Sequence, residues 1–140
     1  MPNRKLAVLL KDQNPLVLTL QDTVQRACGC MWERRVGSVL VTDEHQHLCG
    51  TFTGRDAVRA LAQGNDPSKT PLSQAMTPDP VTLSPRAPAI DALRAMNEGG
   101  FRHLPVVDEG RIWGVLSRGD FSGLELERLD EEIHLAECIW

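Results

Sequence analysis

The chain has 140 residues, of which 41% are hydrophobic and 24% are charged, and its formal net charge at pH 7 is −4. This composition is ordinary for a soluble globular protein, and a negative charge with dispersed basic residues argues against a protein that binds nucleic acid by neutralising phosphates. No apolar stretch has the length that spans a bilayer, and four cysteines without a signal peptide predict a reducing, cytoplasmic compartment.

The first half of the chain predicts a strand, a helix, two strands and a second helix. The first helix is indicated by apolar residues at helical spacing, which are Val24, Ala27, Cys28 and Met31. Thr19 with Asp22 suits the N-cap of this helix. The runs "VGSVLVT" at 36–42 and "LCGTFT" at 48–53 have strand character, and the second leads directly into a helix start, "GRDAVRAL", at 54–61.

The second half repeats this order after the segment "GNDPSKTPLSQAMTPDP" at 64–80, whose Gly, Pro, Ser and Asp content predicts a linker. Its helical stripe consists of Ala89, Ala92, Leu93 and Met96. Ser84 with Pro85 suits the start of that helix. The strands "FRHLPVV" at 101–107 and "IWGVLS" at 112–117 follow, and Pro105 places the first of them at or near a sheet edge.

Two segments complete the chain. The run "RGDFSGLEL" at 118–126 predicts the start of a helix. The acidic stretch that follows has no counterpart in the first half, and its apolar positions are Leu126, Leu129, Ile133, Cys138 and Trp140. We expect this tail to form a helix that packs on its own module or on a second copy.

A tandem repeat explains these parallels. A shift of 65 residues places Leu18 on Leu83, Met31 on Met96 and Val41 on Val106. One residue is lost in the polar turn that follows, and the offset becomes 64. With that offset Gly50 meets Gly114, Thr53 meets Ser117 and Asp56 meets Asp120.

The stretches "GTFTGRD" at 50–56 and "GVLSRGD" at 114–120 thus carry a glycine, a hydroxyl residue and an aspartate at the same spacing. Each copy fits a helix capping box, in which the hydroxyl accepts from a backbone amide and the carboxylate reaches back to the N-cap. A hydroxyl at the positive end of a helix also suits a phosphate, and a carboxylate suits a vicinal diol. Capping and ligand binding can coexist in one residue, so both interpretations stay open.

Together with "VGSVLV", "FRHLPVVDE" and "AMTPDPVTLSP", these stretches resemble a tandem pair of CBS domains, the family named after cystathionine β-synthase. The resemblance implies an α/β (α+β) fold of two β-α-β-β-α repeats packed sheet to sheet around a pseudo-two-fold axis. The repeat limits predict CBS domain 1 at 8–63, a linker and lead-in at 64–79, CBS domain 2 at 80–124 and the tail at 125–140.

The resemblance also implies a regulatory, energy-sensing module that binds AMP, ADP, ATP, NAD or S-adenosylmethionine in clefts between the two domains. In such members the hydroxyl of the repeated stretch meets phosphate and the aspartate meets the ribose hydroxyls, while an arginine in the same turn adds a charge-assisted contact. The predicted residues of the two turns are Thr53, Arg55, Asp56, Ser117, Arg118 and Asp120. The predicted adenine walls are Val36, Gly37, Ser38 and Val39 in one half and Phe101, Arg102, His103 and Leu104 in the other.

Other classes of function are weaker. The alternative is a structural interaction or dimerisation module with unused clefts. No nucleophile with a partnered base is evident, so neither an enzyme nor a catalytic cofactor is expected. Cys28 and Cys30 face different ways on a helix and do not form a metal site with Cys49, His45 or His47.

Assembly is expected through the helices that begin near Asp56 and Asp120. The first has more apolar residues than one core-facing stripe requires, namely Ala57, Val58, Ala60, Leu61 and Ala62. Such a surplus needs a cover. We therefore expect a homodimer, although the tail could cover this helix instead, and an unidentified regulated protein as a further partner, with no nucleic acid and no membrane.

Overall fold

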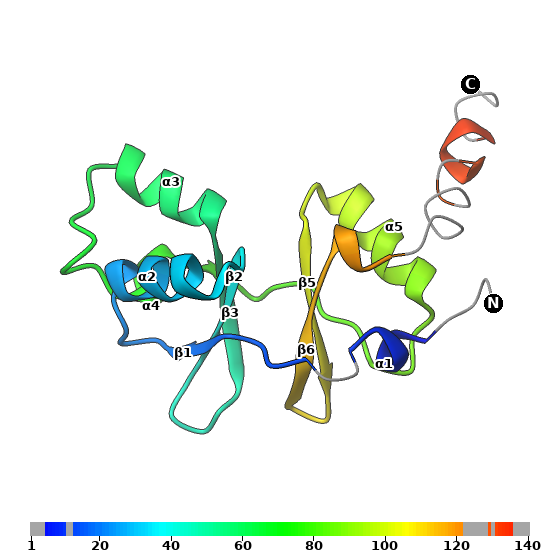
Figure 1. The fold of residues 1–140 in the computed structure, drawn as a ribbon, viewed down its shortest axis with the longest axis horizontal. Helices are drawn as coiled ribbons and strands as arrows, with labels where there is room; N and C mark the ends of the chain where they lie inside the picture. The colour runs from blue at the N-terminus through cyan, green and yellow to red at the C-terminus, as the bar shows by residue number, and fades with distance from the viewer. Residues whose placement is uncertain (1–4, 11–12, 122–128, 130, 136–140) are drawn as a thin grey trace. The chain divides into compact units, whose positions relative to one another are not determined.

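The computed structural model describes residues 5–10, 13–121, 129 and 131–135 (Figure 1). Contacts divide the chain into two units. The first-half unit contains Asn14–Pro80 and Glu109–Ile112, and the second-half unit contains Met1–Gln13, Val81–Asp108 and Trp113–Trp140. The N-terminal segment thus belongs to the second-half unit, whereas the sequence repeat counts residues from position 8 onward in the first domain.

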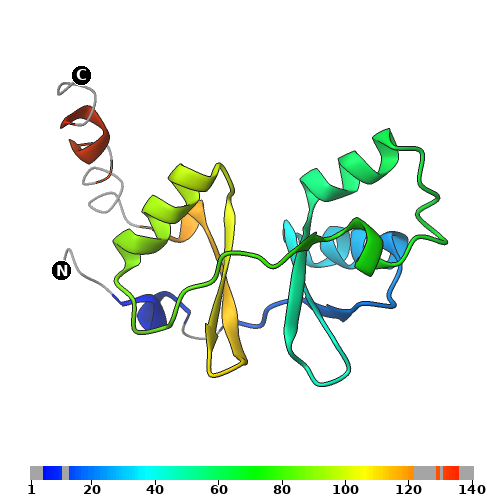
Figure 2. The same cartoon turned by 180° about the vertical axis from the view of Figure 1, so that it is seen from behind.

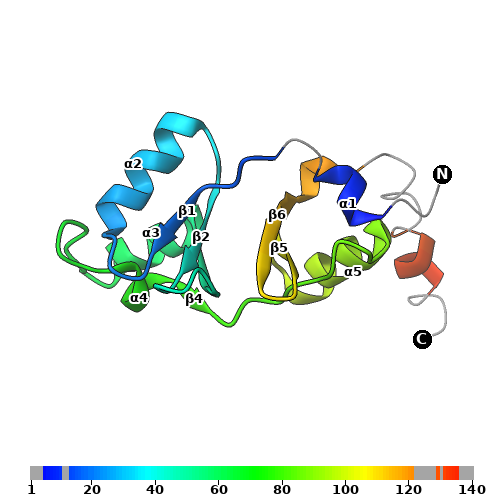
Figure 3. The same ribbon diagram turned by 90° about the horizontal axis from the view of Figure 1, so that it is seen from below.

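The first-half unit is built on a four-stranded sheet. Its strands, in the order of the sheet, are β1 (Val17–Thr19), β2 (Ser38–Thr42), β3 (Leu48–Thr53) and β4 (Thr77–Pro78). Only the pair β1–β2 is parallel. The helices α2 (Val24–Arg34), α3 (Gly54–Ala62) and α4 (Leu72–Ala75) lie on one face of this sheet (Figure 3). Their apolar residues and those of the strands form the core, which includes Val24, Ala27, Met31, Val39, Val41, Phe52, Ala60 and Leu72.

The start of α2 differs from the prediction. Thr23 is the N-cap, and its side chain accepts a hydrogen bond of 3.1 Å from the backbone N–H of Arg26. Asp22 does accept from the backbone N–H and the hydroxyl of Thr19, but this contact closes a turn before the helix. Thr19 cannot cap the helix because it lies in β1, paired with Thr42, four residues before the N-cap Thr23.

The segment predicted as a linker is packed for part of its length. Leu72 and Ala75 of α4 are buried in the core of the first-half unit. Thr77 and Pro78 then pair with β3 as the edge strand β4. This segment is ordered although it is polar and rich in proline, because its apolar side chains are buried in the core of the unit instead of being exposed to water.

The second-half unit contains a two-stranded sheet (Figure 2). Its elements are α1 (Leu6–Leu9), α5 (Ala89–Gly99), β5 (His103–Asp108), β6 (Arg111–Ser117) and the 3₁₀ turn η1 (Arg118–Asp120). The strand predicted before α5 is reduced to a single parallel bridge between Leu83 and Val106. The carbonyl of Pro105 accepts from Leu83 on that side. Pro105 has no backbone N–H, and the side of β5 to which that group would point is this weakly paired edge. This agrees with the predicted place of Pro105 at or near a sheet edge.

The start of α5 also differs from the prediction. The helix begins at Ala89, with Pro88 as an extended N-cap residue. Ser84 instead closes a turn, since its hydroxyl accepts from the backbone N–H of Arg86 and its carbonyl accepts from Ala87. The predicted cap at Ser84 and Pro85 is wrong because this turn delays the helix until after the second proline.

The N-terminal segment completes the core of the second-half unit. The backbone N–H of Leu6 donates to the carbonyl of Ala87 over 2.9 Å, which satisfies one amide that a helix start leaves unpaired. The side chains of Leu6 and Leu10 are buried in this core. The side-chain amide of Gln13 exchanges two hydrogen bonds of 2.9 and 3.0 Å with the backbone of Val115, much as a neighbouring strand would.

The described part of the tail packs on its own unit, which was one of the two expected alternatives. Leu129 is 3% exposed and Ile133 packs against the same core. Arg94 of α5 holds Glu132 with two hydrogen bonds of 2.8 and 2.7 Å. The predicted tail residues Leu126, Cys138 and Trp140, and the predicted helix beyond Phe121, lie outside the described residues.

The predicted fold class is confirmed, because the structure is a mixed α+β fold with one four-stranded and one two-stranded sheet. None of the helices in the described part of the chain is both long and apolar enough to cross a membrane.

Candidate functional site

The first copy of the repeated stretch forms the turn between β3 and α3. Thr53 is the extended N-cap residue of α3 and forms a complete capping box with Asp56. The backbone N–H of Thr53 donates to Asp56 Oδ2 over 2.9 Å, and the Thr53 hydroxyl lies 3.2 Å from the same oxygen. The capping interpretation of the motif therefore applies to this copy.

The carboxylate of Asp56 is fully used inside the protein. Its other oxygen, Oδ1, accepts from the hydroxyl of Thr77 and from Nη2 of Arg59, each over 2.9 Å. The same Arg59 nitrogen also donates to the carbonyl of Ala75 over 2.9 Å. An ionised carboxylate offers about four acceptor positions, and Asp56 receives four donors while its residue is 4% exposed. Asp56 thus ties α3 to the segment at 75–77.

The second copy forms the turn between β6 and η1. The backbone N–H of Ser117 donates to Asp120 Oδ2 over 2.7 Å, and the Ser117 hydroxyl lies 3.3 Å from that oxygen. This arrangement matches the first copy. Asp120 is exposed, however, and no hydrogen bond or ion pair reaches its Oδ1 from any described residue. Among the residues that the structure describes, none therefore competes with an external donor for this oxygen.

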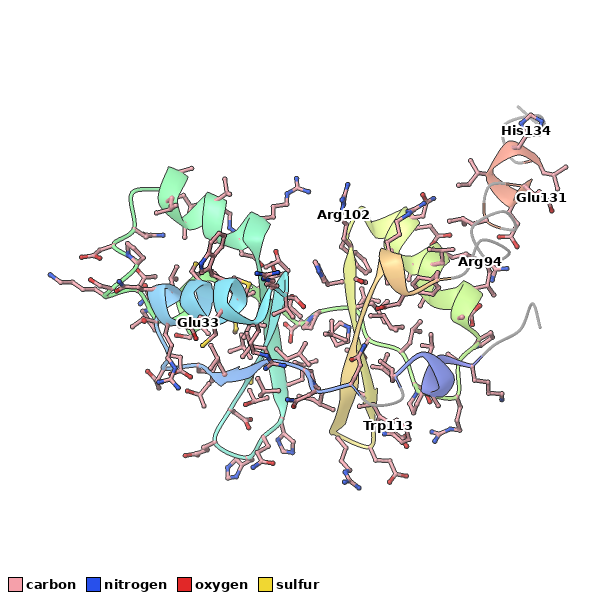
Figure 4. The ribbon with its side chains drawn as sticks, viewed as in Figure 1. Glu33, Arg94, Arg102, Trp113, Glu131 and His134 are labelled. Carbon is pink, nitrogen blue, oxygen red and sulfur yellow. The ribbon has the colours of Figure 1, made fainter. Side chains whose placement is uncertain are left out.

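Basic groups gather at the same end of the second-half sheet. β5 begins at His103 and β6 ends at Ser117, so the two positions are neighbours in the hairpin. Burial and the charge of Arg102 lower the pKa of His103, while the carboxylate of Asp120 acts in the opposite direction. Arg102 and Arg118 are exposed, and Figure 4 shows Arg102 at the tip of β5. The arginines can therefore bind an anion next to the position where Asp120 can bind a diol.

A family model for the CBS domain matches the chain twice, at residues 10–63 and 72–126. The chain belongs to the CBS domain family. The resemblance seen in the repeated stretches is confirmed by this match.

Similar proteins come from several organisms. The CBS domain-containing protein CBSCBSPB5 of Arabidopsis thaliana is 41% identical over 125 residues, which are 87% of this chain and 23% of that protein. This chain spans between 19% and 23% of the length of the five Arabidopsis relatives that it matches. The CBS domain-containing protein YhcV of Bacillus subtilis is 35% identical and is matched over 71% of each chain. A CBS domain protein of Pyrobaculum aerophilum, solved in complex with AMP, has a TM-score of 0.82 and 27% identity, and the match covers 91% of this chain and 99% of that chain.

The predicted adenine walls of the CBS pair divide into exposed and buried positions. Ser38 and Val39 are buried in β2, and Leu104 is buried in β5, so mainly their backbone could face a ligand. Phe101 and His103 are half-buried. The residues that precede the strands, Val36, Gly37 and Arg102, are exposed, as is Arg55 in the first turn.

An open groove of about 800 Å³ lies within the first-half unit, between the end of α2 and the start of α3. Its lining is Cys28, Met31, Trp32, Glu33, Arg35, Val36, Gly37, Gly54 and Ala57. Burial raises the pKa of the Cys28 thiol, which keeps it from acting as an activated nucleophile at neutral pH. No group of three or more His, Cys, Asp or Glu side chains that could hold a metal ion occurs among the described residues.

Two partners of the site were not found from the sequence. Arg59 stands three residues after Asp56, a spacing at which opposite charges meet on a helix, so this ion pair was readable in principle. Thr77 is far along the chain, in the stretch "AMTPDPVTLSP", which indicated the family but no contact with Asp56. Its contact with Asp56 depends on the pairing of β3 with β4 and carries no local signal.

Proposed function

We propose that this CBS pair is a cytoplasmic regulatory module that binds an adenosine-containing ligand and passes the bound state to a partner protein. The candidate ligands are AMP, ADP, ATP, NAD and S-adenosylmethionine. The observation that carries the proposal is the exposed carboxylate of Asp120, of which one oxygen is bound by none of the described residues and which lies beside His103. Arg102 and Arg118 are its exposed basic neighbours along the chain.

The chemistry of such a ligand fits these groups. A ribose offers two adjacent hydroxyl donors, which a carboxylate oxygen accepts. A phosphate is met by guanidinium groups, which form the strongest charge-assisted hydrogen bonds in proteins. The similar Pyrobaculum protein was solved with AMP, a molecule that contains both groups.

A thermal-shift panel of the five ligands tests the proposal. A ligand at a hundred times its dissociation constant stabilises the folded state by about 2.7 kcal/mol, which raises the Tm of a chain of this size by several degrees. The matched control is 2′,3′-dideoxyadenosine monophosphate, which keeps the base and phosphate but lacks the diol, and we expect a much smaller shift. Unchanged Tm values with all five ligands at millimolar concentration would contradict the proposal.

The second candidate is a structural interaction module whose repeated turns only cap helices. It is favoured by Asp56, whose carboxylate is already saturated by Thr53, Thr77 and Arg59. In that case the same panel gives no shift, and replacement of either aspartate lowers stability alone.

We also propose that the module forms a homodimer through the helical face of the first-half unit. Trp32 of α2 is 85% exposed, and Val58 and Leu61 of α3 are 67% and 62% exposed. These side chains lie on the same helix pair that lines the groove. Large apolar side chains exposed together mark an interaction surface more often than an isolated one does.

A further inference from the structure

The two copies of the repeated stretch differ in what their aspartates contact. Both carboxylates accept from the N-cap backbone, at 2.9 Å for Asp56 and 2.7 Å for Asp120. The second oxygen of Asp56 is held by Thr77 and Arg59. The second oxygen of Asp120 receives nothing from the described residues, and Asp120 is exposed. A diol therefore reaches Asp120 without displacing any of these bonds, whereas at Asp56 it must first displace them.

The second copy has no counterpart of the Arg59 side chain that binds Asp56 in the first copy. With the offset of 64 residues, the position that corresponds to Arg59 is Gly123, which has no side chain. No cation can therefore approach Asp120 from that position. This difference lies in the covalent structure, so it does not depend on the conformation of the chain.

The two copies also differ in the residues at the start of the strand before the repeated stretch. With the offset of 65 residues, Gly37 and Ser38 of the first half correspond to Arg102 and His103 of the second. Gly37 has no side chain, whereas Arg102 is exposed and cationic. Arg55 and Arg118 supply one cation to each turn, so Arg102 is a cation that the second copy has at a position where the first copy has none.

We propose that the two copies have different tasks: the second takes the ligand, one molecule for each chain, and the first is a structural brace. Asp120 accepts from the ribose diol, and Arg102 with Arg118 meets the phosphate. Asp56 joins α3 to the segment at 75–77 through Arg59 and Thr77. This inference rests on the proposed function and specifies which of the two turns performs it.

Isothermal titration calorimetry with AMP on the full chain tests the division. The wild type is expected to bind one AMP per chain. Asp120→Asn weakens AMP binding about 10-fold or more, because a neutral amide accepts a diol less well than a carboxylate does, while the Tm without ligand changes little. Asp56→Asn lowers the Tm and leaves the dissociation constant within about twofold. If Asp56→Asn does not fold, Thr77→Val removes one donor to Asp56 and provides the same comparison.

A matched pair of arginine variants tests the charge asymmetry. Arg102→Gln weakens AMP binding about 10-fold and leaves the binding of adenosine, which has no phosphate, almost unchanged. Arg55→Gln, the exposed arginine of the first turn, leaves both unchanged. Two AMP molecules per chain, or a loss of binding in Asp56→Asn with none in Asp120→Asn, overturns the inference.

These outcomes separate the inference from the proposed function. A wild-type chain that binds two AMP molecules, or that binds one through Asp56, still is an adenosyl-binding module and contradicts only the division of tasks. A wild-type chain that gives no heat with AMP, ADP, ATP, NAD or S-adenosylmethionine contradicts the proposed function, and the inference fails with it.

Discussion

His103 combines partial burial, a neighbouring arginine and a nearby carboxylate in one imidazole. Burial and Arg102 favour its neutral form, and Asp120 opposes them only in part, so its pKa lies below the ordinary histidine value. As the pH falls, the unfolded chain therefore takes up this proton before the folded chain does. The free energy of unfolding then decreases from about pH 7 downward, until the pKa of the folded state is reached.

We expect His103→Gln to remove this part of the pH dependence. Urea unfolding of the wild type and the variant between about pH 5 and pH 8 measures it, because the difference between their free energies of unfolding changes only where His103 titrates. His45→Gln, which replaces an exposed histidine in the turn after β2, is the matched control for the loss of an imidazole. Parallel curves for His103→Gln and the wild type would contradict this account.

At the residue scale, the sequence predicts contacts that are close along the chain and misses those that are not. Both capping boxes follow from a spacing of three residues, and the structure contains them. The caps of α2 and α5 were each predicted four residues too early, at Thr19 for Thr23 and at Ser84 for Pro88, because Thr19 and Ser84 close turns that use the same side-chain chemistry. The difference between Asp56 and Asp120 was predictable only in part: the replacement of Arg59 by Gly123 is visible in the sequence, whereas the contact with Thr77 depends on the tertiary fold.

At the element scale, Gly50 in β3 and Gly114 in β6 allow another segment of the chain to lie close against each of these strands. A Cβ on Gly50 of β3 would lie 2.6 Å from the sulfur of Met76 and 2.7 Å from the backbone oxygen of Thr77. A Cβ on Gly114 of β6 would lie 2.9 Å from the side chain of Leu10. The two glycines thus correspond in sequence and in role, although different segments approach them.

Gly50→Ala is therefore expected to destabilise the protein. The backbone oxygen of Thr77 can move only if β4 moves, and overpacking of this kind costs about 1–3 kcal/mol. Gly54→Ala at the start of α3 is the matched control, since its Cβ meets nothing within 4 Å, and it should leave the stability unchanged or raise it by up to about 1 kcal/mol. Urea unfolding at neutral pH compares them. Equal stability of Gly50→Ala and the wild type would mean that β4 does not lie against β3.

Most elements with a periodic apolar pattern were predicted, as was a strand before the first helix, which is β1, whereas α4 and β4 were not. The strands β2, β3, β5 and β6 and the helices α2, α3 and α5 all appear where alternation or helical spacing indicated them. The helix α4 and the strand β4 have four and two residues, which is too short for either period to be visible. They form because Leu72 and Ala75 enter a core that the rest of the unit builds.

At the scale of the whole molecule, the expected homodimer rests on the exposed apolar side chains of α3. Leu129 and Ile133 are used in the core of the second-half unit, and Val58 and Leu61 stay largely exposed. We therefore expect a dimer at micromolar concentration in light scattering. Replacement of both Val58 and Leu61 by Glu should give a monomer with unchanged far-ultraviolet circular dichroism, because charges on an apolar interface oppose its burial.

Leu135→Glu is the matched control for this surface. Leu135 is 63% exposed in the described part of the tail, so a new charge there should leave the dimer intact. A wild-type chain that is monomeric under these conditions contradicts the homodimer, and dissociation by Leu135→Glu would locate the interface on the tail instead.

The bond between Leu6 and Ala87 also sets an order in which the chain can fold as it is synthesised. Residues 14–80 supply nearly all of the first-half unit, so this unit can form as soon as they have left the ribosome. Leu6, Ala7 and Gln13 must wait much longer, because the carbonyls of Pro85 and Ala87 and the strand that binds Gln13 are made later. Leu6 and Gln13 are thus made before the groups that bind them and are among the last residues of the second-half unit to find their place.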